Sequence, residues 1–210
     1  MDRQSHWQSI FQTRTSLEVS WYQPHLRASL ELIGQIGLPP TASIIDVGAG
    51  DSTLVDDLLA YGYSQISLLD ISLAALDRVR TRLGSVAEKI TWIEADITQV
   101  RLPTNTYDLW HDRALFHFLT SDSDRCHYVE QVHNALKPGG VLILATFAHD
   151  GPVRCSGLDT LRYSPEALCQ ELGTDFELIR SLSEMHRTPS GNEQKFSYCL
   201  LMKSAQARFR

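Results

Sequence analysis

The sequence lacks paired cysteines, a basic run and a long apolar stretch, and each absence excludes a class of protein. Its four cysteines show no C-x-x-C spacing, which argues against a zinc ribbon or a disulfide framework and predicts reduced thiols and a cytoplasmic location. A formal net charge of −6 without a lysine and arginine cluster argues against a nucleic-acid groove. No segment approaches the roughly 18 consecutive apolar residues of a membrane span, and no apolar signal core follows Met1. We therefore expect neither nucleic acid nor a membrane as a partner.

A glycine turn near residue 50 lacks the third glycine of a dinucleotide-binding fingerprint. Residues 43–53, SIIDVGAGDST, predict a strand, a tight turn at Gly48 and Gly50, and the start of a helix. Thr53 stands where the pattern G-x-G-x-x-G has its last glycine. Asp51 adds a negative charge at the beginning of the helix, where it would repel a pyrophosphate. The turn is therefore suited to a ligand that carries hydroxyls or a positive charge.

Three predicted strands each end in an aspartate. Asp46 ends the first strand, Asp70 ends the second, and Asp96 follows the third. Asp70 lies about 20 residues after the glycine turn, which is the spacing at which an acidic residue meets a ribose hydroxyl. Because the carboxyl ends of parallel strands share one edge of a sheet, we expect these carboxylates to gather at a single site.

Strand-like and helix-like segments alternate along the middle of the chain. This alternation predicts an α/β fold with a doubly wound, mostly parallel sheet and helices on both faces. The length of 210 residues and the hydrophobic content of 43% suit one domain with a sizeable core. The expected strands are 44–47, 65–69, 90–94, 107–111 and 140–147, and the expected helices are 52–61, 73–83 and 122–136.

The two ends of the chain differ from this middle part. Residues 1–42 predict an N-terminal helical extension that acts as a lid, and residues 43–205 form the main domain. Near the C-terminus, Ser164 and Pro165 predict the start of a helix. The segments 176–186 and 194–203 predict two strands joined by a short turn, so they must pair antiparallel.

Five motifs occur in a familiar order: DVGAG at 46–50, LDI at 69–71, EADI at 94–97, YDLW at 107–110 and LKPGGVLIL at 136–144. By these motifs the chain, over roughly residues 44–203, resembles the class I, seven-stranded, Rossmann-like S-adenosylmethionine-dependent methyltransferases. The resemblance implies the strand order 3-2-1-4-5-7-6 with an antiparallel last strand, and S-adenosyl-L-methionine as cofactor.

The same resemblance implies roles for particular residues. It places Asp46, Gly48, Ala49 and Gly50 around the methionine part of the cofactor. Asp70, followed by Ile71, would hold the ribose, and Asp96 with Ile97 would flank the adenine. The patterns W-x3-F at 7–11 and EVSWY at 18–22 also look like the N-terminal region of protein-lysine methyltransferases of the elongation-factor and citrate-synthase type.

The densest polar cluster follows the fourth strand, in residues 110–117. The hypothesis is that Asp112 orients the cofactor or accepts a proton, while His111 or His117 serves as base, and His111 also contacts the cofactor. The alternatives are a helix-face histidine packed between phenylalanines and a local ion pair of Asp112 with Arg113. Trp21 and Tyr22 either form a hydrophobic clamp or line the methyl-transfer pocket.

The functional expectation is methyl transfer to an unidentified nucleophile, either a protein lysine or a small molecule, by a monomer or weak homodimer. The alternatives are a nicotinamide-dependent oxidoreductase and a non-catalytic cofactor-binding module. A metal site built from Cys155, His186 and Cys199 matches no zinc spacing and is discounted.

Overall fold

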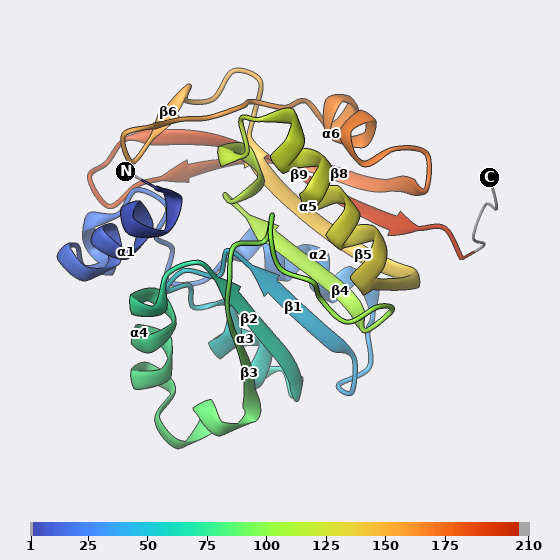
Figure 1. Ribbon diagram of the computed structural model, residues 1–210, viewed down its shortest axis with the longest axis horizontal. Helices are drawn as coiled ribbons and strands as arrows, with labels where there is room; N and C mark the ends of the chain where they lie inside the picture. The colour runs from blue at the N-terminus through green and yellow to red at the C-terminus, as the bar shows by residue number, and fades with distance from the viewer. Residues whose placement is uncertain (1, 206–210) are drawn as a thin grey trace.

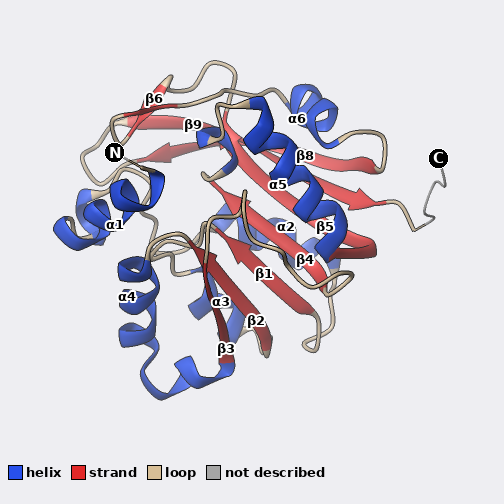
Figure 2. Ribbon diagram, viewed as in Figure 1, coloured by secondary structure: helices blue, strands red, loops and turns tan. Residues whose placement is uncertain are grey.

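The computed structural model describes residues 2–205, which form one twisted sheet covered by helices on both faces (Figures 1 and 2). The strands of the sheet are β1 (Ser43–Val47), β2 (Gln65–Asp70), β3 (Ile90–Glu94), β4 (Tyr107–Arg113), β5 (Leu136–Phe147), β8 (Phe176–Arg187) and β9 (Glu193–Lys203). The helices are α1 (Arg3–Thr13), α2 (Arg27–Ile36), α3 (Leu54–Ala60), α4 (Leu73–Leu83), α5 (Asp122–Ala135) and α6 (Pro165–Leu172). Shorter elements are the 3-10 turns η1 (Ser16–Glu18), η2 (Gly84–Lys89) and η3 (Phe116–Phe118), and the small ribbon of β6 (Arg154–Cys155) and β7 (Leu158–Asp159).

The strand order is β3-β2-β1-β4-β5-β9-β8. The first five strands pair in parallel, whereas β9 pairs antiparallel with both β5 and β8. This order confirms the predicted fold class. The short connection between β8 and β9 forces these two strands to pair antiparallel, because parallel pairing of consecutive strands needs a long crossover connection.

Local sequence signals set most helix boundaries. Ser72 caps α4 by accepting a hydrogen bond from Ala75 N–H, and Ser164 caps α6 in the same way with Pro165 in the first turn. Several boundaries differ from the predicted ones by one to four residues, and two of these differences have a clear local cause. Helix α3 begins at Leu54, because residues 51–53 still belong to the turn. Strand β5 begins at Leu136, which pairs with Tyr107 before a bulge in β5.

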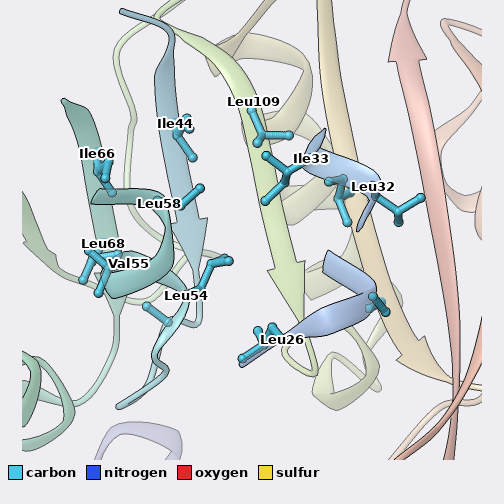
Figure 3. Packing of buried hydrophobic residues seen from close by; sticks show 14 of the residues in the cluster. Leu26, Leu32, Ile33, Ile44, Leu54, Val55, Leu58, Ile66, Leu68 and Leu109 are labelled. Carbon is cyan, nitrogen blue, oxygen red and sulfur yellow. The ribbon is translucent and has the colours of Figure 1, made fainter. Parts of the chain in front are cut away.

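Two apolar layers cover the sheet. On one face α2 and α3 contribute buried residues such as Leu32 and Leu58, which pack with Ile44 and Leu109 of the sheet (Figure 3). Helix α4 adds Leu76 to the same cluster. On the other face α5 and α6 pack against the alternate residues of the same strands. Between residues 2 and 205, no helix is both long and apolar enough to cross a membrane.

Candidate active site

A cavity with about 1120 Å³ of empty space, its open mouth included, lies beyond the carboxyl ends of β1, β2 and β4. Helix α1 lies across this edge of the sheet (Figure 1), and its residues Trp7 and Phe11 line the cavity. Every residue that the sequence predicted for the cofactor also lines it: Trp21, Tyr22, Asp46, Gly48, Ala49, Gly50, Asp70, Ile71, Asp96, Ile97 and His111. The fold therefore brings these residues together, while their contact with a cofactor stays a prediction.

Asp70 is held rigidly at the end of β2. Its two carboxylate oxygens accept hydrogen bonds of 2.8 Å from the backbone N–H groups of Gly50 and Ser72. Burial raises the pKa of Asp70 to about 6, with smaller contributions from the charges of Asp46 and Asp51. Each oxygen keeps a second lone pair, so the carboxylate can still accept hydrogen bonds from a pair of hydroxyls.

The other acids at this end of the cavity have partners of their own. Asp51 accepts hydrogen bonds from Ser16 Oγ at 2.6 Å and from Arg78 Nη1 at 3.2 Å. Asp96 forms an ion pair with Arg3 of α1 at 3.1 Å, and Arg3 also contacts Asp124 on α5. These ion pairs fasten α1 over the cavity. They also lower the net negative charge that the acids create there.

The glycine turn fits tightly between two apolar side chains. Gly48 has a φ of 68°, and a Cβ added to it would lie 2.5 Å from Leu115 Cδ1. Gly50 has a φ of 55°, and its added Cβ would lie 3.1 Å from Phe11 Cζ. Both glycines are therefore required by backbone conformation and by space. Their backbone atoms remain at the cavity wall, where a ligand can approach them.

His111 joins three elements beneath the cavity. Its Nδ1 lies 2.7 Å from Asp46 Oδ1, and its Nε2 lies 2.8 Å from Ser29 Oγ on α2. Because the Asp46 carboxylate accepts from Nδ1–H, the other nitrogen accepts from the serine hydroxyl. Both nitrogens are engaged, so the structure gives no support to the hypothesis that His111 is a base.

Asp112 lies on the opposite face of β4 from His111, and it is not among the residues that line the cavity. It is fully buried and accepts hydrogen bonds from Tyr128 Oη at 2.7 Å and from Leu115 N–H at 3.0 Å. Tyr128 in turn accepts a hydrogen bond from Trp110 Nε1. This placement argues against the hypothesis of a catalytic Asp112, because neighbouring residues of a strand point to opposite faces and only His111 reaches the cavity. The alternative ion pair with Arg113 is also absent from the ion pairs within residues 2–205.

His117 lines the cavity at the end away from the Asp70 carboxylate, and it is fully buried. Phe147 N–H donates to its Nδ1 at 3.1 Å, which places the proton of the neutral ring on Nε2. Burial lowers the pKa of His117 to about 3, and the nearby charge of Arg113 adds to this effect. Within residues 2–205, Nε2 has no hydrogen-bond partner. His117 is therefore a neutral donor, which argues against the predicted role as base.

At the aromatic end of the cavity, sequence reasoning named Trp21, Tyr22 and His117 but missed several other lining residues. Trp7 and Trp21 pack edge to face, and Trp7 also contacts Phe118. Phe147 of β5 and Phe196 of β9 lie opposite each other in the sheet, and both line the cavity together with Gln194. No sequence motif marks Gln194 or Phe196, because their position depends on the antiparallel register of β9.

The cavity fits S-adenosylmethionine better than a phosphate-bearing nucleotide. Four carboxylates, those of Asp46, Asp51, Asp70 and Asp96, line one end, and they suit ribose hydroxyls and a cationic group. Arg3, the basic residue that lines this end, is already paired with Asp96 and Asp124.

Comparisons with known proteins agree with this fit. Residues 44–140 match the family Methyltransf_25, described as a methyltransferase domain. The eEF1A lysine and N-terminal methyltransferase of Mus musculus is 24% identical over 68% of this chain and 21% of its own length, and that of Bos taurus is 26% identical over 57% and 17%. The chain thus spans about a fifth of the length of these curated relatives.

Solved structures show the same fold at low identity. A structure that concerns the conversion of a disulfide bond into a thioacetal group during echinomycin biosynthesis has a TM-score of 0.78, with 16% identity over 98% of this chain and 95% of its own. The 1,6-didemethyltoxoflavin-N1-methyltransferase of Burkholderia thailandensis, with S-adenosylhomocysteine bound, has a TM-score of 0.70, with 18% identity over 96% and 87%.

The fold is that of the class I methyltransferases, and residues 44–140 match the model of a methyltransferase domain. S-adenosylmethionine is the cofactor of this class, as the sequence predicted. Nothing among these findings supports the nicotinamide-dependent alternative.

Proposed function

We propose that this protein is an active S-adenosylmethionine-dependent methyltransferase whose acceptor enters the aromatic end of the cavity. The observation that carries the proposal is one continuous cavity with two different ends. One end is lined by the carboxylates and the glycine turn, and the other by aromatic rings and by polar atoms that have no hydrogen-bond partner among the described residues. A non-catalytic module would have no use for a second end with buried polar groups.

In this proposal each predicted residue contributes to binding. Asp70 accepts hydrogen bonds from the ribose hydroxyls, while Asp96 and Ile97 flank the adenine. Asp46 and the backbone of residues 48–50 surround the methionine part, with His111 fixing the Asp46 carboxylate. The cofactor supplies an electrophilic methyl group, so the protein needs mainly to position the acceptor in line and exclude water. The aromatic rings of Trp7, Trp21 and Phe118 provide that exclusion.

Two acceptor classes follow from the comparisons. The curated relatives are named for methylation of a protein lysine and an N-terminus, which favours an amine of a protein. The Burkholderia thailandensis structure is named for a small heterocycle, which favours a small molecule. We also propose a cytoplasmic location, supported by four cysteines that are all unpaired. A monomer or weak homodimer without nucleic acid remains the expectation.

Incubation with radiolabelled cofactor tests the activity. The protein is added to a cell lysate that has been separated into macromolecules and small solutes, and label is counted in each. We expect transfer into one of the two fractions and tight binding of S-adenosylhomocysteine in calorimetry. Binding without transfer into either fraction would favour the non-catalytic module.

A further inference from the structure

The aromatic end of the cavity contains buried polar atoms without hydrogen-bond partners within residues 2–205. Two of them are donors, His117 Nε2 and Arg113 Nη2, and two are amide oxygens, Gln23 Oε1 and Gln194 Oε1. His117 is completely buried and Gln194 is 9% exposed. A buried polar group without a hydrogen-bond partner is energetically costly, so several of them at one end of a cavity indicate a ligand that supplies partners.

The charged side chain that lines this end of the cavity is Arg113. Arg113 donates to Tyr198 Oη at 2.8 Å and to Trp21 O at 2.9 Å, and its guanidinium lies 4.6 Å from the centroid of Phe196. Glu184, which is not among the lining residues, lies 3.8 Å from Arg113 Nη2. Among the described residues at this end, no carboxylate lines the cavity. An ammonium group entering here would therefore meet the guanidinium, while Glu184, the carboxylate paired with it, lies outside the lining.

The titratable side chains around Arg113 offer no free basic nitrogen. His117 uses its basic nitrogen to accept from Phe147 N–H. His186 of β8 uses both nitrogens, with Ser20 O at 2.6 Å and Gln23 Nε2 at 2.9 Å, and burial lowers its pKa. Burial also raises the pKa of the Cys155 thiol and raises the pKa of Tyr198 to about 12, so both groups stay protonated near neutral pH.

On the basis of the proposed function, we infer that the methyl acceptor is a small acidic nucleophile, a thiol or an acidic phenol, that binds as its anion. The donors His117 Nε2–H and Arg113 Nη2–H would face the anion, and the rings of Phe147 and Phe196 would pack against its apolar body. A lone pair of the anion forms the bond to the methyl carbon, while the bond from sulfur to that carbon breaks and its electron pair stays on sulfur. The anion becomes a neutral thioether or aryl ether, so no proton has to be removed. A lysine ammonium, with an ordinary pKa near 10.4, would first need a base.

The charge of a bound phenol tests this inference directly. The probe is 4-nitrophenol, whose anion absorbs at longer wavelength than the neutral form, added to wild-type protein saturated with S-adenosylhomocysteine. We expect the anion band at a pH where free 4-nitrophenol is mostly protonated. Binding as the neutral phenol, or no saturable binding, would overturn the inference. The measurement needs no variant and no turnover.

A variant pair assigns the effect to His117. His117→Phe removes the donor and keeps an aromatic ring against Phe147, and we expect it to weaken binding of the anion by about 10- to 100-fold. His133→Phe makes the same substitution on α5 outside the cavity and should leave binding unchanged. Equal binding by both variants and wild type would contradict the role of His117.

Methyl transfer to matched acceptors completes the test. Thiophenol and benzylamine have similar size, but near neutral pH the amine is almost entirely protonated. We expect kcat/KM for thiophenol to exceed that for benzylamine by on the order of 100-fold. Faster transfer to benzylamine or to a lysine peptide would refute the anionic acceptor but leave the proposed function intact. Failure of the proposed function would appear differently, as no transfer in any lysate fraction.

Discussion

The substitution Asp112→Asn separates a structural role for this residue from the catalytic role that the sequence suggested. Burial raises the pKa of Asp112 from its ordinary value of 3.8 to about 7, even though Tyr128 and Leu115 donate hydrogen bonds to it. This difference corresponds to about 4 kcal/mol between the two protonation states of the folded protein. Because the folded state binds the proton more tightly than the unfolded state, this contribution to stability is present below pH 4 and is lost as the pH rises to 7.

Asparagine cannot titrate, so the variant lacks this part of the pH dependence. Its Oδ1 can keep the hydrogen bond from Leu115 N–H, while Tyr128 loses its acceptor at a cost of about 1 kcal/mol. Between pH 5 and pH 8, we expect the unfolding free energy of Asp112→Asn to rise by up to about 3 kcal/mol relative to wild type. Urea unfolding followed by circular dichroism at both pH values measures this change. Other titrating groups, including Asp70 and His117, contribute equally to the unfolding free energies of both proteins, so their contributions cancel in the difference.

The matched control is Asp122→Asn, because the side chain of Asp122 is 93% exposed. We expect its unfolding free energy to follow the wild type at both pH values. Methyl transfer by Asp112→Asn should stay within about tenfold of wild type, since the side chain does not line the cavity. A constant difference in stability across pH, or a loss of kcat beyond 100-fold with unchanged cofactor binding, would refute the reasoning.

Three further predictions concern the cofactor end of the cavity. Asp70→Ala should weaken S-adenosylhomocysteine binding by about 10- to 100-fold in calorimetry, and wild-type affinity in the variant would contradict the ribose assignment. The affinity of the wild type should also fall below pH 6, because Asp70 becomes protonated there. Gly48→Ala should lower the unfolding free energy by about 1–3 kcal/mol, because the new Cβ meets Leu115, whereas Gly34→Ala in α2 has free space and should not destabilise. Arg3→Ala should raise the Kd of S-adenosylhomocysteine several-fold at unchanged melting temperature, as it releases α1 from Asp96; equal Kd values would show that α1 is held by its apolar residues alone.

Most of the fold was predictable because its signals are local. Apolar runs that end in Asp46 and Asp70 predicted two strands correctly, and Ser164 with Pro165 predicted the start of α6. The gathering of the acids at one edge followed from topology, since parallel strands all point the same way. Neither inference needed a side-chain contact between distant segments.

The faces of the central strand were not predictable in this way. His111 and Asp112 are adjacent, and only their side-chain directions decide which of them reaches the cavity. In a sheet covered on one side only, polar and apolar residues alternate and reveal the direction. Here both faces are covered, so Leu109, Trp110, His111 and Asp112 are all buried and the alternation disappears.

The distribution of charge along the cavity could be derived only from the structure. The acids come from β1, β2 and β3, which are neighbours in sequence, whereas Arg113 gains its position from contacts with Trp21 and with Tyr198 of β9. In the inferred arrangement, the acids at one end suit a cationic cofactor and Arg113 at the other end suits an anionic acceptor, and these groups come from opposite halves of the sheet. Reversing the charge at the Arg113 end would therefore change which acceptor binds without altering the acids that hold the cofactor. This separation explains how chains with one common fold and cofactor site can differ in acceptor.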